Sequence, residues 1–161
     1  MKRLLLLRHA KSEHLYGIND PDREINSRGK QDSKLMGNWL KANIKSPELI
    51  LCSTSVRTRM TLDIILRETN WDSKKEYTQL LYLPSAADVL NVLSEKQETI
   101  ESILVVGHNF GFTDLFNHLS YKKLDNLPTC GFSEFGINKP WDKLYMSKFD
   151  LNSFKIPKEL K

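Results

Sequence analysis

Three short, uninterrupted apolar segments stand out along the chain. They cover residues 4–7, 49–52 and 103–106, and each is followed closely by polar or glycine residues. Four apolar residues in a row are too few for an amphipathic helix, and a continuous pattern is typical of a strand that is covered on both faces. The sequence therefore predicts three buried β-strands of the kind found in parallel sheets.

Helical patterns alternate with these strands. Apolar residues recur at intervals of three and four, the spacing of one helix face, in segments 35–40, 56–66 and 112–119. A shorter helix is expected at 89–93, after a proline and serine that break the chain pattern. Strands that alternate with helices are typical of an α/β protein.

After residue 128 the pattern changes. Segments 132–137 and 144–149 both have the character of strands, and no helix is predicted between them, so we expect them to pair antiparallel at one edge of the sheet. The predicted fold class is α/β, a sandwich of helices around a mostly parallel sheet with an antiparallel edge. No repeat or linker interrupts the chain, so residues 1–161 are expected to form a single domain.

Composition narrows the class of protein. Of the 161 residues, 40% are hydrophobic and 27% are charged, as in ordinary globular proteins. The net charge of +4 is modest and the lysines lie among acids, so we expect no nucleic-acid binding. Cys52 and Cys130 are too few and too far apart for a disulfide framework. No segment approaches the roughly 18 apolar residues of a membrane span, and the short run near the N-terminus is no signal peptide. The expected location is the cytoplasm.

Polar and titratable side chains follow all three predicted strands. Arg8 and His9 come directly after the first, Arg57 follows the second by a few residues, and His108 and Asn109 follow the third. Ligands of open α/β sheets bind beyond the carboxyl ends of the strands. If the three strands are parallel neighbours, these side chains converge on one spot. A helix that begins near Arg57 would add its N-terminus, which favours anions.

This combination suits a tetrahedral dianion. Guanidinium groups offer forked donors to phosphate oxygens, and a neutral histidine can act as a nucleophile. Neighbouring arginines should lower the pKa of such a histidine, because like charges disfavour the imidazolium. Any one of these histidines alone would more often be structural. The spacing of His9 and His14 misses the known zinc patterns, and no glycine-rich nucleotide loop is present. We therefore expect neither a metal nor a cofactor.

Five blocks of the sequence resemble the histidine phosphatase superfamily, whose members include the phosphoglycerate mutase-like enzymes. Segment 4–12 resembles the family's N-terminal signature, and its Ala-Lys-Ser after Arg-His, where most members have glycine, is similar to the SixA-type branch of phosphohistidine phosphatases. The other matching blocks, in chain order, are 20–29, 47–61, 107–109 and 127–129. The resemblance covers nearly the whole chain and implies a three-layer α/β/α sandwich.

The resemblance also implies roles for individual residues. His9 would be the nucleophile that becomes phosphorylated, and Arg8 and Arg57 would hold the phosphoryl oxygens. His108 would be the second histidine, in contact with the transferring group. The side chains implied as further substrate-binding residues are Ser12 and Asn109.

One departure from the larger members of the family bears on the substrate. They supply a glutamate acid between the second arginine and the second histidine, and the corresponding stretch here, 80–85, has no carboxylate. Glu76 and Asp88 flank it, and the sequence places neither in the site. An alkoxide leaving group needs a general acid, whereas an imidazole, with a conjugate-acid pKa of about 6.5, is far less demanding. The departure therefore favours a phosphohistidine over a phosphoester.

The sequence thus predicts a metal-independent phosphohistidine phosphatase that acts through a phospho-His9 intermediate. Its expected partner is a phosphorylated protein, for example a histidine phosphotransfer domain of a signalling relay. Two alternatives remain open. A phosphomonoesterase or mutase of the same superfamily would take a small phosphorylated substrate and would need a carboxylate near the leaving oxygen. A non-catalytic phosphate-binding module would keep the pocket without turnover.

Overall fold

The three buried strands predicted from the sequence form the centre of the fold. In the computed structural model, which describes all 161 residues, they are β1 (Lys2–Arg8), β2 (Leu49–Ser53) and β4 (Ser102–Gly107). They lie in the order β2-β4-β1 and pair in parallel, with Leu4 opposite Ile103 where β1 meets β4. Their carboxyl ends therefore meet at one edge of the sheet.

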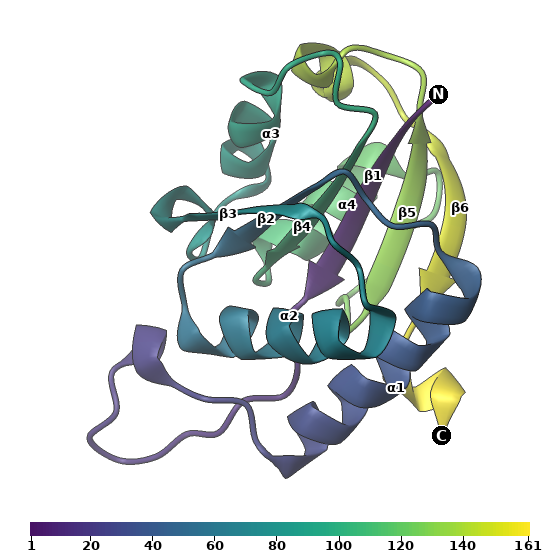
Figure 1. Ribbon diagram of the computed structural model, residues 1–161. Helices are drawn as coiled ribbons and strands as arrows, with labels where there is room; N and C mark the ends of the chain where they lie inside the picture. The colour runs from purple at the N-terminus through teal and green to yellow at the C-terminus, as the bar shows by residue number, and fades with distance from the viewer.

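Three further strands complete a six-stranded sheet of order β3-β2-β4-β1-β5-β6 (Figure 1). β3 (Lys74–Thr78) extends the parallel part beside β2. β5 (Phe132–Ile137) pairs antiparallel with β1, and β6 (Asp150–Lys155) pairs antiparallel with β5. The predicted sheet, mostly parallel with an antiparallel edge, is confirmed.

Helices cover both faces of this sheet (Figure 1). α1 (Ser27–Asn43) and α2 (Val56–Thr69) pack on one face, and α3 (Ala86–Ser94) and α4 (Gly111–Leu119) pack on the other. Each helical segment predicted from the apolar spacing falls inside one of these four helices. The fold is therefore the predicted three-layer α/β/α sandwich.

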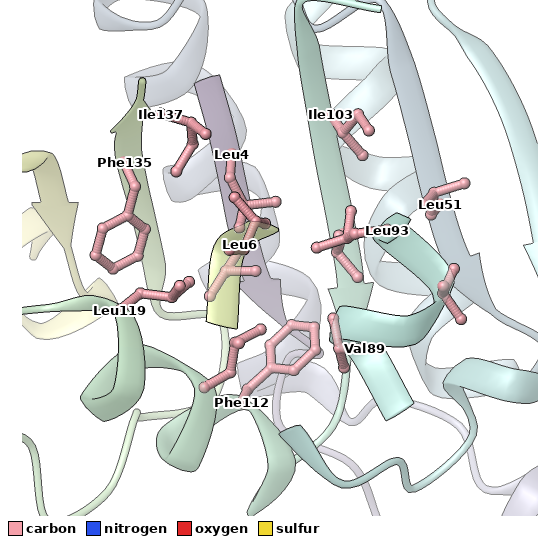
Figure 2. Packing of buried hydrophobic residues seen from close by; sticks show 14 of the residues in the cluster. Leu4, Leu6, Leu51, Val89, Leu93, Ile103, Phe112, Leu119, Phe135 and Ile137 are labelled. Atoms are coloured by element: carbon pink, nitrogen blue, oxygen red, sulfur yellow. The ribbon is translucent and has the colours of Figure 1, made fainter. Parts of the chain in front are cut away.

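The position of β1 between two layers of helices explains why residues 4–7 are apolar without interruption. Leu4 and Leu6 point into the layer of α3 and α4, where Figure 2 shows them within one cluster of buried side chains. Leu5 and Leu7 point into the layer of α1 and α2. Side chains alternate between the faces of a strand, so a strand that is covered on both faces must be apolar at every position. All four leucines are fully buried.

Two local features differ from the sequence prediction. The predicted strand 144–149 is wrong: Trp141–Met146 forms a 3-10 helix, and the strand begins only at Asp150. Trp141 and Leu144 are buried three residues apart, which matches the three-residue turn of a 3-10 helix. β3 was not predicted because its sequence is mostly polar, as is common for a strand at the edge of a sheet.

Short 3-10 helices lie in three of the connections, η1 (Asp20–Asp22), η2 (Gln79–Leu81) and η3 (Trp141–Met146), and a fourth, η4 (Pro157–Leu160), follows β6. The first of them belongs to the long connection between β1 and α1, which borders the site described below. None of the helices combines the length and the apolar character that crossing a membrane requires.

Candidate active site

The carboxyl ends of β1, β2 and β4 border a pocket of about 280 Å³. All six side chains predicted for the site line it: Arg8, His9, Ser12, Arg57, His108 and Asn109. The ring centroids of His9 and His108 are 5.3 Å apart. The structure therefore brings together side chains from three separate parts of the chain, as the strand-end pattern indicated.

His9 is held in a defined position and in one tautomer. Its backbone N–H donates to Gly107 and its carbonyl accepts from Cys130, each at 3.0 Å, which fixes the residue at the end of β1. Its Nδ1 lies 2.8 Å from the carbonyl oxygen of Ala10. A carbonyl can only accept, so Nδ1 carries the proton and Nε2 keeps its lone pair. Nε2 of His9 is thus the ring nitrogen whose lone pair remains free.

The environment of His9 keeps its imidazole neutral. Burial is the largest cause and lowers the pKa of His9 to about 3, although the hydrogen bond to Ala10 opposes it. His108, Arg57 and Arg8 lower the pKa further. The direction is the one the sequence predicted, but burial contributes more than the arginines do. At neutral pH the lone pair of Nε2 is therefore available.

The two arginines share one arrangement. Nη1 of Arg8 donates to the carbonyl oxygen of Leu127, and Nη1 of Arg57 donates to that of Asp20, both at 2.7 Å. The Nε–H group of each arginine is buried and has no acceptor in the protein. A buried donor without a partner costs about 1–3 kcal/mol. Both groups are therefore suited to an anion that enters the pocket.

Helix α2 adds to the attraction for an anion. Arg57 lies in its first turn and is only 2% exposed. Ser55 caps this helix by accepting from the N–H of Thr58. The positive end of the helix dipole and the guanidinium group thus lie at the same side of the pocket.

His108 follows β4 and is held from two sides. Its Nδ1 lies 3.3 Å from Nη2 of Arg57, and its Nε2 lies 2.8 Å from Oγ of Ser53. Because a guanidinium only donates, Nδ1 accepts from Arg57 and Nε2–H donates to Ser53. Burial, followed by Arg57, lowers the pKa of His108 to about 3. A phosphoryl dianion in the pocket would favour the imidazolium and oppose this shift.

Ser12 and Asn109 line the pocket, but their polar atoms also serve the local structure. The hydroxyl of Ser12 accepts from Nη2 of Arg23. Oδ1 of Asn109 accepts from the backbone N–H and the hydroxyl of Thr113, at 3.0 and 2.7 Å. Asn109 therefore fastens the start of α4 as well as facing the pocket.

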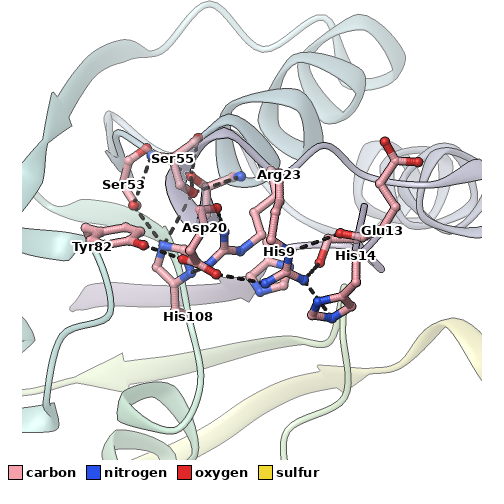
Figure 3. A network of polar contacts seen from close by, with 12 residues as sticks. His9, Glu13, His14, Asp20, Arg23, Ser53, Ser55, Tyr82 and His108 are labelled. Carbon is pink, nitrogen blue, oxygen red and sulfur yellow. Dashed lines mark hydrogen bonds and ion pairs between the residues drawn. The ribbon is translucent and has the colours of Figure 1, made fainter. Parts of the chain in front are cut away.

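Three polar residues near the site were not singled out from the sequence. Asp20 and Arg23 line the pocket, and the hydroxyl of Tyr82 donates to the carboxylate of Asp20 (Figure 3). The Tyr82 ring also packs against His108, with centroids 5.5 Å apart. Asp20 and Arg23 lie in block 20–29 of the family resemblance, which is the signal that could have identified them. The remaining lining residues are Lys11, His14, Leu83 and Thr129.

The carboxylate in the pocket comes from the β1–α1 connection. Glu76 pairs with Lys96 at 2.9 Å, and Asp88 caps α3, so neither of the flanking acids lies in the site. Asp20 instead accepts from Nη2 of Arg57 at 3.0 Å. The stretch 80–85 lacks a carboxylate, but the site as a whole does not.

Asp20 is ionised at neutral pH. Burial raises its pKa, but hydrogen bonds from Tyr82, Arg23 and Arg57 lower it by more, so the pKa lies well below the usual range. The pocket thus contains fixed cations, the neutral imidazoles of His9 and His108, and one carboxylate. Nowhere in the chain do three or more histidine, cysteine, aspartate or glutamate side chains gather in a cluster that could hold a metal ion.

The N-terminal half of the chain matches a known protein family. Residues 4–80 match the model of the histidine phosphatase superfamily, branch 1. Two uncharacterized proteins of Mycobacterium tuberculosis, MT1313 and Rv1276c, are 36% identical over 102 residues, which is 63% of this chain. The chain covers 62% of the length of these two relatives. An uncharacterized protein of Mycobacterium leprae, ML1117, is 27% identical over 94% of this chain and its own full length.

Solved structures share the complete fold. A SixA structure from Nakamurella multipartitia has a TM-score of 0.85 at 22% identity and covers 97% of this chain and 96% of its own. The protein histidine phosphatase SixA complexed with tungstate has a TM-score of 0.83 at 23% identity and covers 99% of both chains. A mycobacterial glucosyl-3-phosphoglycerate phosphatase is less similar, with a TM-score of 0.67 at 15% identity, and covers 97% of this chain and 100% of its own. Residues 4–80 thus match the histidine phosphatase superfamily, and the whole chain shares the fold of the SixA structures.

Proposed function

We propose that the chain is a phosphatase that hydrolyses phosphohistidine on a protein partner through a phospho-His9 intermediate, without a metal ion or a cofactor. One observation carries the proposal: a neutral histidine with a free Nε2 lies beside two arginines whose buried Nε–H groups have no acceptor. Nucleophile and anion donors therefore share one pocket.

The chemistry follows from this arrangement. Nε2 of His9 attacks phosphorus in line, while Arg8 and Arg57 donate to the equatorial oxygens, where negative charge must be stabilised. His108 lies at the same pocket and stabilises the same oxygens once the dianion has favoured its imidazolium. Water then attacks the phosphorus of phospho-His9, and phosphate leaves. Transfer between two imidazoles keeps the bond type, so neither step requires a strong acid.

Two observations support a protein as the substrate. SixA structures match this fold more closely than the sugar-phosphate phosphatase does, with TM-scores of 0.85 and 0.67. In addition, Leu83 borders the pocket and Phe110 follows the lining residue Asn109, and both are exposed, by 52% and 67%. Exposed apolar side chains beside a charged pocket suit contact with the surface of a protein substrate.

We propose that residues 1–161 act as one domain, in the cytoplasm, within a signalling relay.

The direct test is release of phosphate from a phosphohistidine protein, in the presence of EDTA, beside a phosphoester control. We expect turnover of the phosphohistidine substrate by the wild-type chain and none by His9→Ala. Turnover that disappears with EDTA, or that persists in His9→Ala, would contradict the proposal.

A second function is favoured by one specific observation. A phosphomonoesterase or mutase for a small metabolite needs a carboxylate near the leaving oxygen, and Asp20 lies in the pocket, although its pKa, well below the usual range, counts against proton donation from it. A panel that compares phosphohistidine with phosphoglycerates separates the two functions. Faster hydrolysis of a phosphoglycerate would favour this second function.

A further inference from the structure

Asp20 is the one carboxylate among the side chains that line the pocket. Four lining side chains are the cationic residues Arg8, Lys11, Arg23 and Arg57. The side chain of Asp20 is 40% exposed, so it belongs to the accessible surface of the pocket. A negative charge on the wall of the pocket repels a bound phosphoryl dianion. The carboxylate can favour only a part of the substrate that is cationic or donates a hydrogen bond.

The carboxylate is fixed from three sides (Figure 3). Oδ1 accepts from Nη1 of Arg23 at 2.8 Å, and Oδ2 accepts from Nη2 of Arg57 at 3.0 Å and from the hydroxyl of Tyr82. A carboxylate offers about four lone-pair positions. Three donors leave room for one more, and the exposed side of Asp20 can present it to a ligand.

The need to orient Arg57 does not by itself explain why residue 20 carries a carboxylate. The backbone carbonyl of Asp20 already orients Arg57 by accepting from Nη1 at 2.7 Å. A neutral amide at this position could still accept from Nη2. What the carboxylate adds is its charge and an acceptor for a cationic donor group.

We propose that Asp20 contacts the leaving group of the substrate and accepts a hydrogen bond from its N–H, so that the site selects phosphorylated, protonated imidazoles over phosphoesters. The inference rests on the proposed function and adds a specificity-determining residue to it. A phosphorylated imidazole that carries a proton on its other ring nitrogen is both cationic and a donor, which suits a fixed carboxylate. The leaving group of a phosphoester becomes anionic and is repelled.

The charge state of Asp20 agrees with this role. The groups that face it are Arg57 from α2, Arg23 from its own connection, Tyr82 after η2 and His108 after β4. Burial raises the pKa of Asp20, but Tyr82, Arg23 and Arg57 keep it well below the usual range, so Asp20 acts as an acceptor and not as a proton donor.

The transfer step balances without any proton transfer. The lone pair of His9 Nε2 forms a bond to phosphorus as the phosphorus–nitrogen bond of the substrate breaks, and that electron pair returns to the substrate ring. The substrate imidazole leaves neutral, with its N–H still on Asp20. The positive charge moves to the His9 ring, which keeps its proton on Nδ1. Water then forms the new phosphorus–oxygen bond, His9 leaves neutral, and both protons of the water remain with dihydrogen phosphate.

The test measures kcat/KM of the wild-type chain and of Asp20→Asn on two probes, an N-phosphorylated histidine peptide and p-nitrophenyl phosphate. We expect Asp20→Asn to lose at least about tenfold more activity on the phosphohistidine peptide than on the ester, since the amide lacks the charge that strengthens a hydrogen bond from a cationic donor. The alkaline limb of the pH profile for the peptide should also move to lower pH. A neighbouring carboxylate raises the pKa of the bound imidazolium, and the amide does not.

Asp22→Asn is the matched control, because Asp22 lies in the same 3-10 helix, is exposed and does not line the pocket. We expect it to leave both rates unchanged. Vanadate binding by Asp20→Asn shows that the variant keeps a folded anion pocket. Equal losses on both probes, with an unmoved pH profile, would mean that Asp20 acts only through Arg57 and would overturn this inference alone. A wild-type chain that cleaves the ester but not the phosphohistidine peptide would overturn the proposed function as well.

Discussion

The pocket has two walls that the chain builds in different ways. The strand-end wall consists of Arg8, His9, Arg57 and His108, which follow β1, β2 and β4. In it His9, Arg57 and His108 are 7%, 2% and 1% exposed. The loop wall consists of Ser12, Asp20 and Arg23 from the β1–α1 connection, where the Asp20 side chain is 40% exposed.

The difference in exposure suggests that the two walls have different roles in catalysis. The buried wall can keep imidazoles neutral and guanidinium groups fixed, which is what attack on a phosphoryl group requires. In the loop wall, the exposed carboxylate of Asp20 can contact whatever the phosphoryl group is attached to. We therefore expect substitutions in the strand-end wall to reduce activity on all substrates, and substitutions in the loop wall to change the ratio between substrates.

The largest effect is expected for the nucleophile. His9→Ala removes Nε2, and loss of a nucleophile commonly costs about 10⁴-fold or more in kcat. Phosphate release measured on a phosphohistidine peptide and on p-nitrophenyl phosphate should fall to background for both. His118→Ala, which changes a histidine on α4 away from the pocket, is the control. If His9→Ala still hydrolyses either probe above background, that activity does not depend on His9.

A smaller but general effect is expected for Arg57→Ala. Removal of one donor that stabilises developing charge costs about 10²–10³-fold in kcat, so both probes should lose at least about a hundredfold. Arg59→Ala is the matched control, because Arg59 lies in the same helix, is exposed and stacks over Tyr77 with 5.3 Å to the ring centroid. Thermal unfolding of both variants checks that the fold persists. An Arg57→Ala variant that loses activity on only one probe would place Arg57 with the loop wall.

A few-fold effect is expected for Tyr82→Phe. The change removes the hydroxyl that donates to Asp20 and leaves the ring against His108. We expect about a threefold to tenfold loss of kcat/KM on the phosphohistidine peptide, in line with the net contribution of one ordinary hydrogen bond, and a smaller loss on the ester. Tyr121→Phe, at an exposed tyrosine, is the control. A larger loss on the ester than on the peptide would contradict the proposed role of the loop wall in favouring the phosphohistidine substrate.

The smallest effect concerns stability. Burial lowers the pKa of His9 and of His108 to about 3 in the folded chain, whereas an unfolded histidine titrates near 6.5. Between these values the unfolded state binds more protons, so the free energy of unfolding falls as the pH drops below about 6.5. We expect the Tm to decrease between pH 7 and pH 5, and to decrease less when His9 and His108 are both replaced by glutamine. An equal decrease in the double variant would contradict the neutral state of these imidazoles.

The strand-end wall could be predicted from the sequence, whereas of the loop wall only Ser12 was predicted, through the family resemblance. Buried parallel strands are apolar at every position, so their ends are visible in the sequence, and Arg8, His9, His108 and Asn109 follow two of those ends directly. Asp20 lies 37 positions before its partner Arg57, in a connection without any periodic pattern. Only the family resemblance pointed to that segment.

The fold shows the same contrast. Helices with a clear apolar face were predicted inside their observed bounds, whereas the polar edge strand β3 was missed and segment 144–149 was assigned to the wrong element. In both places the pattern is local and weak. β3 forms because it pairs with β2. Residues 141–146 form a 3-10 helix because this conformation buries Trp141 and Leu144.

The most direct measurement identifies the phosphorylated atom. The chain is treated with a phosphodonor, quenched under alkaline conditions that preserve phosphohistidine, and analysed by mass spectrometry and NMR. Because Nδ1 of His9 donates to the carbonyl of Ala10, the phosphoryl group should be found on Nε2 of His9. Phosphate on Nδ1 of His9, or on His108 instead, would contradict the proposed nucleophile.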